Sequence, residues 1–310
     1  MSSDRFRLKL ASYNLHNLGR QDHPGGYDAK LRFLADVLRR LAPDVAVVEE
    51  VREEECFFEL ADALGWPTRL LGDEPEETRK IRVGILAQMP AQARGQWHDF
   101  PVALADRSRE AATQEFRRPV PWMRFELANH ESLMVVGVHL KSRRAEVEAL
   151  SDEMPIRRRV VLGQALASAG RVREAAGLRC LLDDEIESGT TDHFAVMGDY
   201  NDGPDSETVL LVAGAGLAGP AEDGSLVCRT LFPVGRRIPG PEPYSYSGWD
   251  RKEFLDHILV SRDLALSLTQ AGVESQLLDA QSGYRGSDGT TRCAGSDHAP
   301  VWAEFELAGG

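Results

Sequence analysis

The sequence predicts one α/β domain, covering residues 1–310, in which two β-sheets pack together and helices lie on the outside. Three observations lead to this fold class. Strand-like segments outnumber helix-like segments, the helices are interspersed among the strands, and polar residues cluster where the strands end. Neither a linker nor a low-complexity segment divides the sequence, and it contains no internal repeat.

The first half of the chain alternates strand and helix patterns. Alternating apolar residues predict a strand over residues 8–13 that ends at Asn14. Leucine and valine at helical spacing predict a helix over residues 27–41. The continuous apolar run 45–48 predicts a strand buried on both faces, which delivers Glu49 and Glu50. The remaining patterns predict a helix over 54–64, an acidic surface loop over 72–80, and strands over 82–88 and 122–127.

The second half continues in the same way. A buried strand over residues 133–140 delivers His139, and a strand over 194–197 leads into Gly198-Asp199. A second long helix is predicted over 156–176, with three apolar residues expected to face the core: Val160, Leu166 and Val172. The other predictions are a short helix over 207–212, a Pro-, Gly- and Arg-rich excursion over 217–252, and final strands over 254–260 and 301–307.

Composition narrows the functional classes. With 310 residues and 42% hydrophobic content, the chain is long enough to bury a large core. The net charge of −13 repels nucleic acid at long range, which lowers the expectation of tight, sequence-independent DNA binding. It does not exclude a nuclease, because a bound cation and local arginines can reverse the field at a site.

The sequence also bears on location. It has no apolar run of about 18 residues, so no membrane span is expected. The polar start, Met1 to Lys9, lacks an apolar signal core, and a cytoplasmic protein is expected. The four scattered cysteines are expected to be reduced thiols: Cys56, Cys180, Cys228 and Cys293.

Two short segments carry the chemistry most clearly. One is Gly198-Asp199-Tyr200-Asn201-Asp202, and the other is Gly295-Ser296-Asp297-His298-Ala299-Pro300. Together they offer carboxylates, an amide and an imidazole, which suit a hard divalent cation and the hydrolysis of a phosphate ester. Taken singly, such residues are more often caps, solvated strand edges or structural histidines. The combination points to one site, and its candidates are Asn14, Glu50, His139, Asp199, Asn201, Asp256, Asp297 and His298.

The order of these segments resembles the endonuclease/exonuclease/phosphatase superfamily, which has the deoxyribonuclease I-like fold. Its motifs are similar to SYNLHNL (12–18), PDVAVVEEV (43–51), VGVHLKS (136–142), VMGDYND (196–202), FLDHILVS (254–261) and GSDHAPV (295–301). The last segment matches the family's terminal Ser-Asp-His-x-Pro-Val without a change. Three departures are Glu49 for glutamine, Tyr200 for phenylalanine and His257 for tyrosine. The extra glutamate is expected to add a charge beside the metal ligand.

The resemblance implies a four-layer α/β/β/α sandwich of two packed mixed β-sheets flanked by helices. It also implies a Mg²⁺ cofactor, with Mn²⁺ or Ca²⁺ as substitutes, at a metal site formed by Asn14, Glu50 and Asp297. His16, two residues beyond Asn14, could also point at this site, and the alternative is a loop histidine with local hydrogen bonds.

The resemblance assigns catalytic roles as well. His298 is a candidate general base or transition-state proton partner, and Asp256 accepts its other N–H. Asp199 and Asn201 position the attacking water, with Asp199 as the alternative base. His139 donates to a phosphate oxygen or the leaving group. Its presence is more similar to the deoxyribonuclease, sphingomyelinase and phosphoinositide-phosphatase branches than to the abasic-site repair branch.

The substrate is less well specified. The candidate contacts in the excursion are Arg236, Arg237, Tyr244, Tyr246, Trp249 and Arg251, although a strand with a solvated basic loop explains most of them. Further cations stand at Arg107, Arg109, Arg117, Arg118 and Lys141, and the run Ser282 to Arg292 is expected to frame the cleft.

The leading hypothesis is a Mg²⁺-dependent phosphoesterase that hydrolyses phosphodiester bonds in DNA or RNA, acting as a monomer. The first alternative is a phosphatase or phosphodiesterase on a small soluble phosphorylated molecule or a lipid headgroup. The second is a catalytically idle binding module, against which the intact set of candidates counts.

Overall fold

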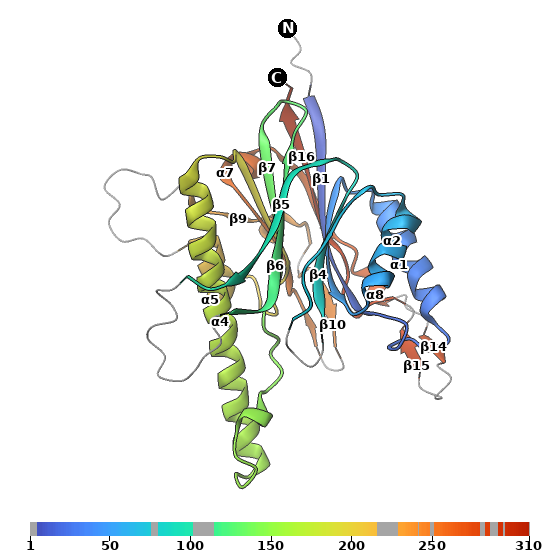
Figure 1. Cartoon of the computed structure of the whole chain (residues 1–310), viewed down its shortest axis with the longest axis vertical. Helices are drawn as coiled ribbons and strands as arrows, with labels where there is room; N and C mark the ends of the chain where they lie inside the picture. The colour runs from blue at the N-terminus through green and yellow to red at the C-terminus, as the bar shows by residue number, and fades with distance from the viewer. Residues whose placement is uncertain are drawn as a thin grey trace, which may run out of the picture.

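Two six-stranded sheets form the centre of the protein (Figure 1). The computed structural model describes residues 5–75, 80–101, 115–215, 229–240, 242–248, 251–279, 283–285, 291–293 and 295–309. The first sheet has the order β13-β16-β1-β2-β4-β3 and the second has the order β5-β6-β7-β8-β12-β9. Each sheet is mixed, because β1 pairs with β2 and β7 with β8 in parallel, while their other neighbours run antiparallel.

The strand bounds follow. The first sheet contains β1 (Arg5–Leu18), β2 (Val45–Val51), β3 (Thr68–Leu71), β4 (Arg82–Ala87), β13 (Leu268–Val273) and β16 (Val301–Ala308). The second contains β5 (Ala91–Asp99), β6 (Glu115–Glu126), β7 (Ser132–His139), β8 (His193–Asp199), β9 (Phe232–Pro233) and β12 (Asp256–Val260). Two small ribbons pair β10 (Tyr246–Ser247) with β11 (Lys252–Glu253) and β14 (Gly283–Arg285) with β15 (Thr291–Cys293).

Helices cover the outer face of each sheet. Helices α1 (Tyr27–Leu41) and α2 (Glu54–Leu64) cover the first sheet, and α4 (Ile156–Ser188) and α5 (Glu207–Ala213) cover the second (Figure 1). The shorter helices are η1 (Val147–Ala149), η2 (Val234–Arg237), α7 (Arg262–Leu266) and α8 (Gln276–Asp279). The predicted four-layer sandwich is therefore confirmed.

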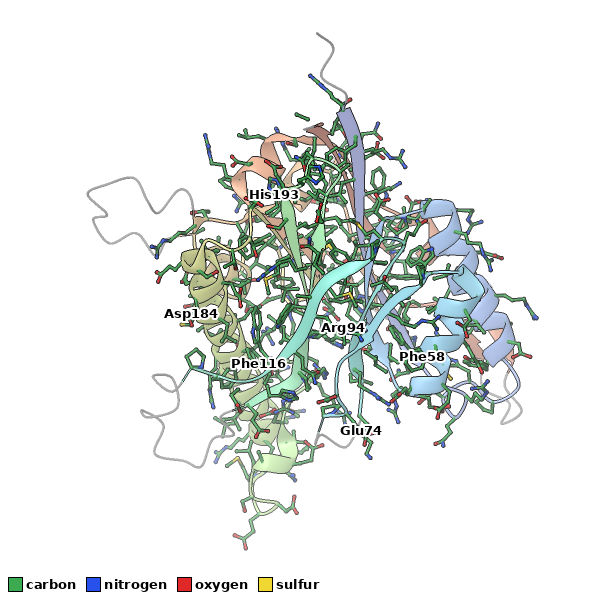
Figure 2. All side chains as sticks on the ribbon, turned by 45° about the horizontal axis from the view of Figure 1, so that its top comes forward. Phe58, Glu74, Arg94, Phe116, Asp184 and His193 are labelled. Carbon is green, nitrogen blue, oxygen red and sulfur yellow. The ribbon has the colours of Figure 1, made fainter. Side chains whose placement is uncertain are left out.

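Three apolar layers hold the sandwich together. Val47 and Phe305 from the first sheet meet Met123 from the second in the layer between the sheets. Phe57 of α2 packs on the first sheet, and Leu178 of α4 packs on the second. The side chains fill these layers in Figure 2. Burial of this apolar surface is the main driving force that fixes the relative position of the two sheets.

Element boundaries follow the local pattern where one element buries one face. The two helices on the first sheet match their predicted bounds. The sequence patterns missed β5 and β13, because these edge strands leave most of their side chains partly exposed and so lack a clear apolar alternation.

The prediction for the long helix α4 was wrong in two respects. The helix continues to Ser188, and Val160 and Leu166 are exposed rather than buried. The first buried residue of α4 is Gly163, and the apolar contacts with the second sheet come mainly from Leu178 and Leu182. The first turns project beyond the ends of the sheets (Figure 1), so no sheet surface is available to cover their apolar side chains.

The predictions for the cysteines, the candidate substrate contacts and a membrane span can also be compared with the structure. Cys56 is buried and Cys180 exposed, and both are free thiols, whereas the side chains of Cys228 and Cys293 lie outside the described residues. Of the candidate substrate contacts, Arg107, Arg109 and Trp249 also lie outside them. No described helix combines the length and the apolar character needed to cross a membrane.

Gly198 offers a test of the β7–β8 pairing. Its φ is +151°, and a Cβ built there would lie 1.8 Å from the Val138 carbonyl oxygen. Gly198→Ala should therefore lower the free energy of unfolding by about 3 kcal/mol in urea titrations. Gly203→Ala is the matched control, because nothing lies within 4 Å of its Cβ, and its effect should stay below about 1 kcal/mol. Equal effects of the two substitutions would contradict the close approach.

Candidate active site

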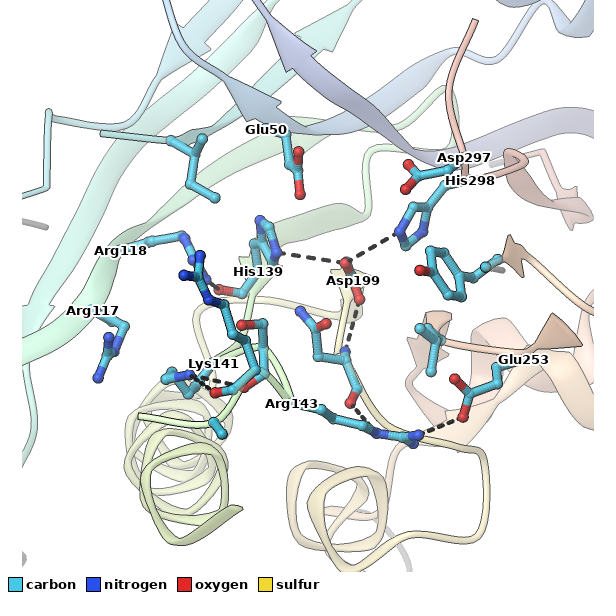
Figure 3. Close-up of a pocket in the computed structure, with 18 of the residues that line it drawn as sticks. Glu50, Arg117, Arg118, His139, Lys141, Arg143, Asp199, Glu253, Asp297 and His298 are labelled. Carbon is cyan, nitrogen blue, oxygen red and sulfur yellow. Dashed lines mark hydrogen bonds and ion pairs between the residues drawn. The ribbon is translucent and has the colours of Figure 1, made fainter. Parts of the chain in front are cut away.

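The predicted site residues meet at one end of the two sheets. In strand register, His139 at the end of β7 lies beside Asp199 at the end of β8, and Asp256 at the start of β12 lies on its other side. A cavity of about 940 Å³ opens here (Figure 3). Six predicted residues line it: Glu50, His139, Asp199, Asn201, Asp297 and His298. The other two, Asn14 and Asp256, are fully buried and contact the lining residues from behind.

Irregular backbone at the ends of β1 and β2 lies beside the cavity, and Glu50, in this segment, lines it. Glu50 has a φ of +61°, and His16 and Asn17 have φ values of +51° and +57°. The pairing of β1 with β2 shifts register in this region. The Asn17 N–H donates to Glu50 Oε2 at 3.0 Å, so the two irregular segments hold each other. Such left-handed backbone at non-glycine residues costs free energy and is concentrated at functional sites.

Asp199 is at the centre of the hydrogen-bond network. The Asn14 side-chain amide donates to its Oδ2 at 3.1 Å, and the Asn201 backbone N–H donates to its Oδ1 at 2.7 Å. The Nε2 atoms of His139 and His298 lie 3.5 and 3.9 Å from Oδ2. Burial raises the pKa of Asp199 to about 7, against the opposing effect of His298. Its carboxyl group can therefore gain or lose a proton near neutral pH.

His298 forms a close pair with Asp256. The distance from His298 Nδ1 to Asp256 Oδ2 is 2.8 Å, which fits the predicted hydrogen bond. Burial by itself lowers the pKa of His298, but the Asp256 and Asp199 carboxylates outweigh burial and raise that pKa well above its usual range. The structure thus favours an imidazolium at His298, which is a proton donor and a positive charge rather than a base.

Contacts with Ser296 and Tyr246 fix the position of His298. The Ser296 hydroxyl donates to the Asn14 carbonyl oxygen at 2.6 Å and accepts from the His298 N–H at 3.0 Å. The Tyr246 ring lies against the imidazole, with centroids 4.9 Å apart. The imidazole is therefore held both to β1 and to the β10 ribbon.

Glu49 was expected to add a negative charge beside Glu50, but its surroundings favour the neutral form. It is fully buried, and its Oε1 accepts a hydrogen bond from the Ser12 hydroxyl at 2.9 Å. Burial, reinforced by the nearby Asp256 charge, raises the pKa of Glu49 well above its usual range. The neutral acid is favoured, so this departure from the family motif adds a buried protonated carboxyl group and not a second metal-facing charge.

A cationic wall forms the opposite side of the cavity. Arg118 Nη1 donates to the carbonyl oxygens of His139 and Leu140 at 3.0 and 3.2 Å, which supports the end of β7. Arg143 Nε donates to the Asn201 carbonyl oxygen at 2.9 Å, and its other nitrogens pair with Asp202 and Glu253. The cations that line the cavity are Arg117, Arg118, Lys141, Arg143, Arg144 and Arg251.

Arg143 and Arg144 are lining residues that the sequence analysis missed. The run of cations just after His139, at positions 141, 143 and 144, was the available signal. Tyr246 and Arg251 line the cavity as expected for substrate contacts, but Arg236, Arg237 and Tyr244 do not. Of the run Ser282 to Arg292, the structure describes only the backbone of the β14–β15 ribbon.

The predicted metal ligands have hard oxygen donors at the cavity surface. The Glu50 and Asp297 carboxylates both line the cavity, above His139 and Asp199 in Figure 3. His16 Nδ1 lies 3.5 Å from Asp297 Oδ1. The Asn14 amide is already engaged, because its oxygen accepts the His16 N–H at 2.9 Å. Carboxylates with access to water fit a Mg²⁺ ion that keeps several of its waters.

A second acidic cluster has a different explanation. Asp199, Asp256 and His298 place one potential ligand atom each within 4.8 Å of one another, the single such group found among the described residues. The His298–Asp256 hydrogen bond accounts for this proximity, and a protonated imidazole cannot ligate a metal. We therefore regard this group as a proton-transfer network.

This arrangement defines a class of protein. An Asp–His pair, a second aspartate with a pKa near neutrality and a cationic wall around outward-facing carboxylates are the parts of a phosphoesterase site. The model of the Endonuclease/Exonuclease/phosphatase family matches residues 11–298. The chain belongs to this family.

Solved structures have the same fold. An endonuclease/exonuclease/phosphatase from Bacteroides vulgatus aligns over 97% of this chain and 99% of its own, with a TM-score of 0.63 and 13% identity. A truncated TDP2 from Caenorhabditis elegans aligns over 98% of both chains, with a TM-score of 0.62 and 12% identity. A mannosyl-6-phosphatase from Bacteroides thetaiotaomicron aligns over 96% and 98%, with a TM-score of 0.61 and 14% identity. No curated protein matches the sequence.

The Asp256–His298 pair can be tested by titration and by kinetics. Asp256→Asn removes the charge that raises the pKa of His298, so that pKa should fall, as measured by NMR titration of the imidazole nitrogens. By analogy with other aspartate-oriented histidines, turnover should fall by up to about 10⁴-fold with little change in KM. Asp192→Asn is the matched control, because Asp192 directly precedes β8 and accepts a hydrogen bond from the Ser132 N–H. An unchanged His298 titration in Asp256→Asn would refute the coupling.

Proposed function

We propose that this protein is a Mg²⁺-dependent phosphoesterase that hydrolyses phosphodiester bonds, as nucleases do. The observation that carries the proposal is the row of contacts from Asn14 through Asp199 and His298 to Asp256, at the base of a cavity with a cationic wall. Hydrogen bonds join Asn14 to Asp199 and His298 to Asp256, and 3.9 Å separates Asp199 Oδ2 from His298 Nε2. In this proposal Glu50 and Asp297 would hold the metal ion, while Asn14, the third residue of the predicted set, has its amide engaged by Asp199 and by the His16 N–H. Bound Mg²⁺ supplies Lewis-acid polarisation of a phosphoryl oxygen.

In this proposal Asp199, His298 and His139 have different roles in proton transfer. Asp199 accepts a proton from the attacking water, since its pKa of about 7 allows the carboxylate form at neutral pH. His298, held as an imidazolium by Asp256, stabilises negative charge on the phosphoryl group and can return a proton. His139, 3.5 Å from Asp199, donates to a phosphate oxygen or to the leaving group. This assignment favours Asp199 over His298 as the general base.

The cationic wall supports an anionic substrate. Arg143 and Arg118 are committed to backbone carbonyl oxygens of the site, so they position Asn201 and His139. Arg144, with 65% of its side chain exposed, and Arg251, with 60% exposed, remain accessible at the cavity mouth. Together with Tyr246, whose ring lies against His298, they offer charge and an aromatic surface to the part of the substrate beyond the scissile phosphate.

A small phosphate ester is the second candidate substrate. The net charge of −13 opposes long nucleic acid, and one protein of the same fold is named a mannosyl-6-phosphatase. Plasmid DNA, RNA and a panel of phosphomonoesters, each assayed with Mg²⁺ and with chelator, would separate the two. Cleavage of phosphomonoesters alone would replace the phosphodiester proposal with this one.

Glu50 provides the test of the metal. Glu50→Gln removes one charge with little change in shape, so Mg²⁺ affinity measured by calorimetry should fall by about tenfold or more while the circular dichroism spectrum is unchanged. Glu148→Gln is the control, because Glu148 lines the same cavity at its rim with 72% of its side chain exposed. Hydrolysis that persists at full rate in chelator would remove the metal from the proposal.

The pH dependence follows from Asp199. Its pKa is raised to about 7, so the carboxyl is protonated at lower pH and cannot act as a base. At low Mg²⁺, kcat/KM should therefore fall as the pH decreases through about 7, and Asp199→Asn should abolish both the activity and this dependence. Glu148→Gln should retain the wild-type profile. A profile that survives in Asp199→Asn would assign the base elsewhere.

A further inference from the structure

The first turns of α4 expose an unusual concentration of apolar side chains. Among the described residues seven large apolar side chains are exposed, and five of them fall within residues 156–166 of this helix: Ile156 (62%), Val160 (37%), Val161 (64%), Leu162 (44%) and Leu166 (40%). The other two, Phe232 and Leu266, belong to other elements. Scattered exposed apolar residues are ordinary on a protein surface, whereas a cluster marks an interaction site.

The same turns carry a local excess of positive charge. From Ile156 to Leu166 the helix contains no acidic residue and three arginines: Arg157, Arg158 and Arg159. Arg157 and Arg158 are exposed. The nearest acidic residues, Asp152 and Glu153, precede the helix, and Asp152 pairs with Arg159 at 2.7 Å, so the exposed Arg157 and Arg158 carry the excess. In a protein with a net charge of −13, this basic and apolar helix end is distinct from the rest of the surface.

The helix end is connected to the cavity wall. It projects past the sheets together with the loop that contains η1 (Figure 1). The Glu146 N–H of that loop donates to the Gly163 carbonyl oxygen at 3.1 Å, and a Cβ on Gly163 would lie only 2.8 Å from the Glu146 nitrogen. The loop also supplies Arg143, Arg144 and Glu146 to the cavity lining. A surface bound by the helix end would therefore lie close to the cavity mouth.

We propose that the α4 tip, residues 156–166, docks on the surface of an anionic lipid membrane. Arginines interact with the phosphates of the headgroups, and the aliphatic side chains enter the boundary with the acyl chains. Nucleic acid would bind the arginines but leave the aliphatic side chains without a partner. The membrane surface is the occupant that matches both the charge and the apolar side chains, and this docking goes beyond the proposed hydrolytic function.

Vesicle co-sedimentation with the full chain tests the proposal. The wild-type protein should bind phosphatidylcholine vesicles that contain phosphatidylglycerol about tenfold more tightly than vesicles of phosphatidylcholine alone. The double variants Val161→Ser/Leu162→Ser and Arg157→Gln/Arg158→Gln should each weaken that binding by about tenfold. Leu266→Ser, at a site 72% exposed, and Arg39→Gln/Arg40→Gln, on α1, are the matched controls and should bind as the wild type does.

Three outcomes would overturn the docking proposal. The first is vesicle binding that lacks the expected pattern, because the wild type binds both kinds of vesicle equally or neither, or because the tip variants bind as the wild type does. The second is a concentration-dependent dimer in analytical ultracentrifugation that Val161→Ser/Leu162→Ser abolishes, which would make a second copy the occupant. The third is binding to duplex DNA that depends on Arg157 and Arg158 but not on Val161 and Leu162.

Two further measurements serve as controls for the folding and the catalytic activity of the variants. Circular dichroism establishes that each variant is folded, and because the tip is outside the catalytic network, hydrolysis of a soluble chromogenic phosphodiester should be the same in every variant. Vesicle binding requires no turnover. Failure of the docking proposal and failure of the proposed hydrolytic function therefore give different results.

Discussion

The site depends on the burial of Asp199 between two imidazoles and a second carboxyl group. Removing this carboxyl from water raises its pKa to about 7, and the neighbouring Asp256 and His298 determine how the shared protons are distributed. In water the same residues would titrate well apart, with the aspartates far below neutrality and the histidine near it. The sandwich makes them interact because it places the ends of β7, β8 and β12 side by side with little solvent between them.

The two sheets contribute different parts to this network. The second sheet supplies His139, Asp199 and Asp256, whereas the first supplies Asn14 and Glu50. Hydrogen bonds from Asn14 to Asp199 and from Ser296 to the Asn14 backbone cross between chain segments that are 185 and 282 residues apart. Formation of the site therefore requires the complete packed sandwich, and the large apolar layer between the sheets is what holds these polar contacts at hydrogen-bond distance.

Buried polar residues outside the cavity restrict how the lining residues can move. Glu174 of α4 accepts the N–H groups of Lys141 and Arg117 at 2.6 and 3.1 Å, and so ties the helix to the loop after β7 and to β6. Arg171 reaches Asp202 and the Lys141 carbonyl oxygen from the same helix. The second half of α4 is thereby a structural part of the site, while its first turns extend away from it. One continuous helix joins the cavity wall to the exposed basic and apolar end.

Sequence alone predicted the residues that converge on the cavity, because each belongs to a short motif next to the start or the end of a predictable strand. The motif order predicted the four-layer sandwich, and the α1 and α2 bounds followed from a single apolar face. Other properties depended on contacts between distant residues and were decided only by the tertiary structure. Glu49 favours the neutral form because it is enclosed near Asp256, and Asn14 lies behind the cavity because its amide is bound to Asp199. Arg143 is recruited through the Asn201 carbonyl, and Val160 and Leu166 are exposed because the sheets end before the first turns of α4. Local pattern determines which elements form, but burial and the electrostatic field at a residue are set by whatever the fold brings against it.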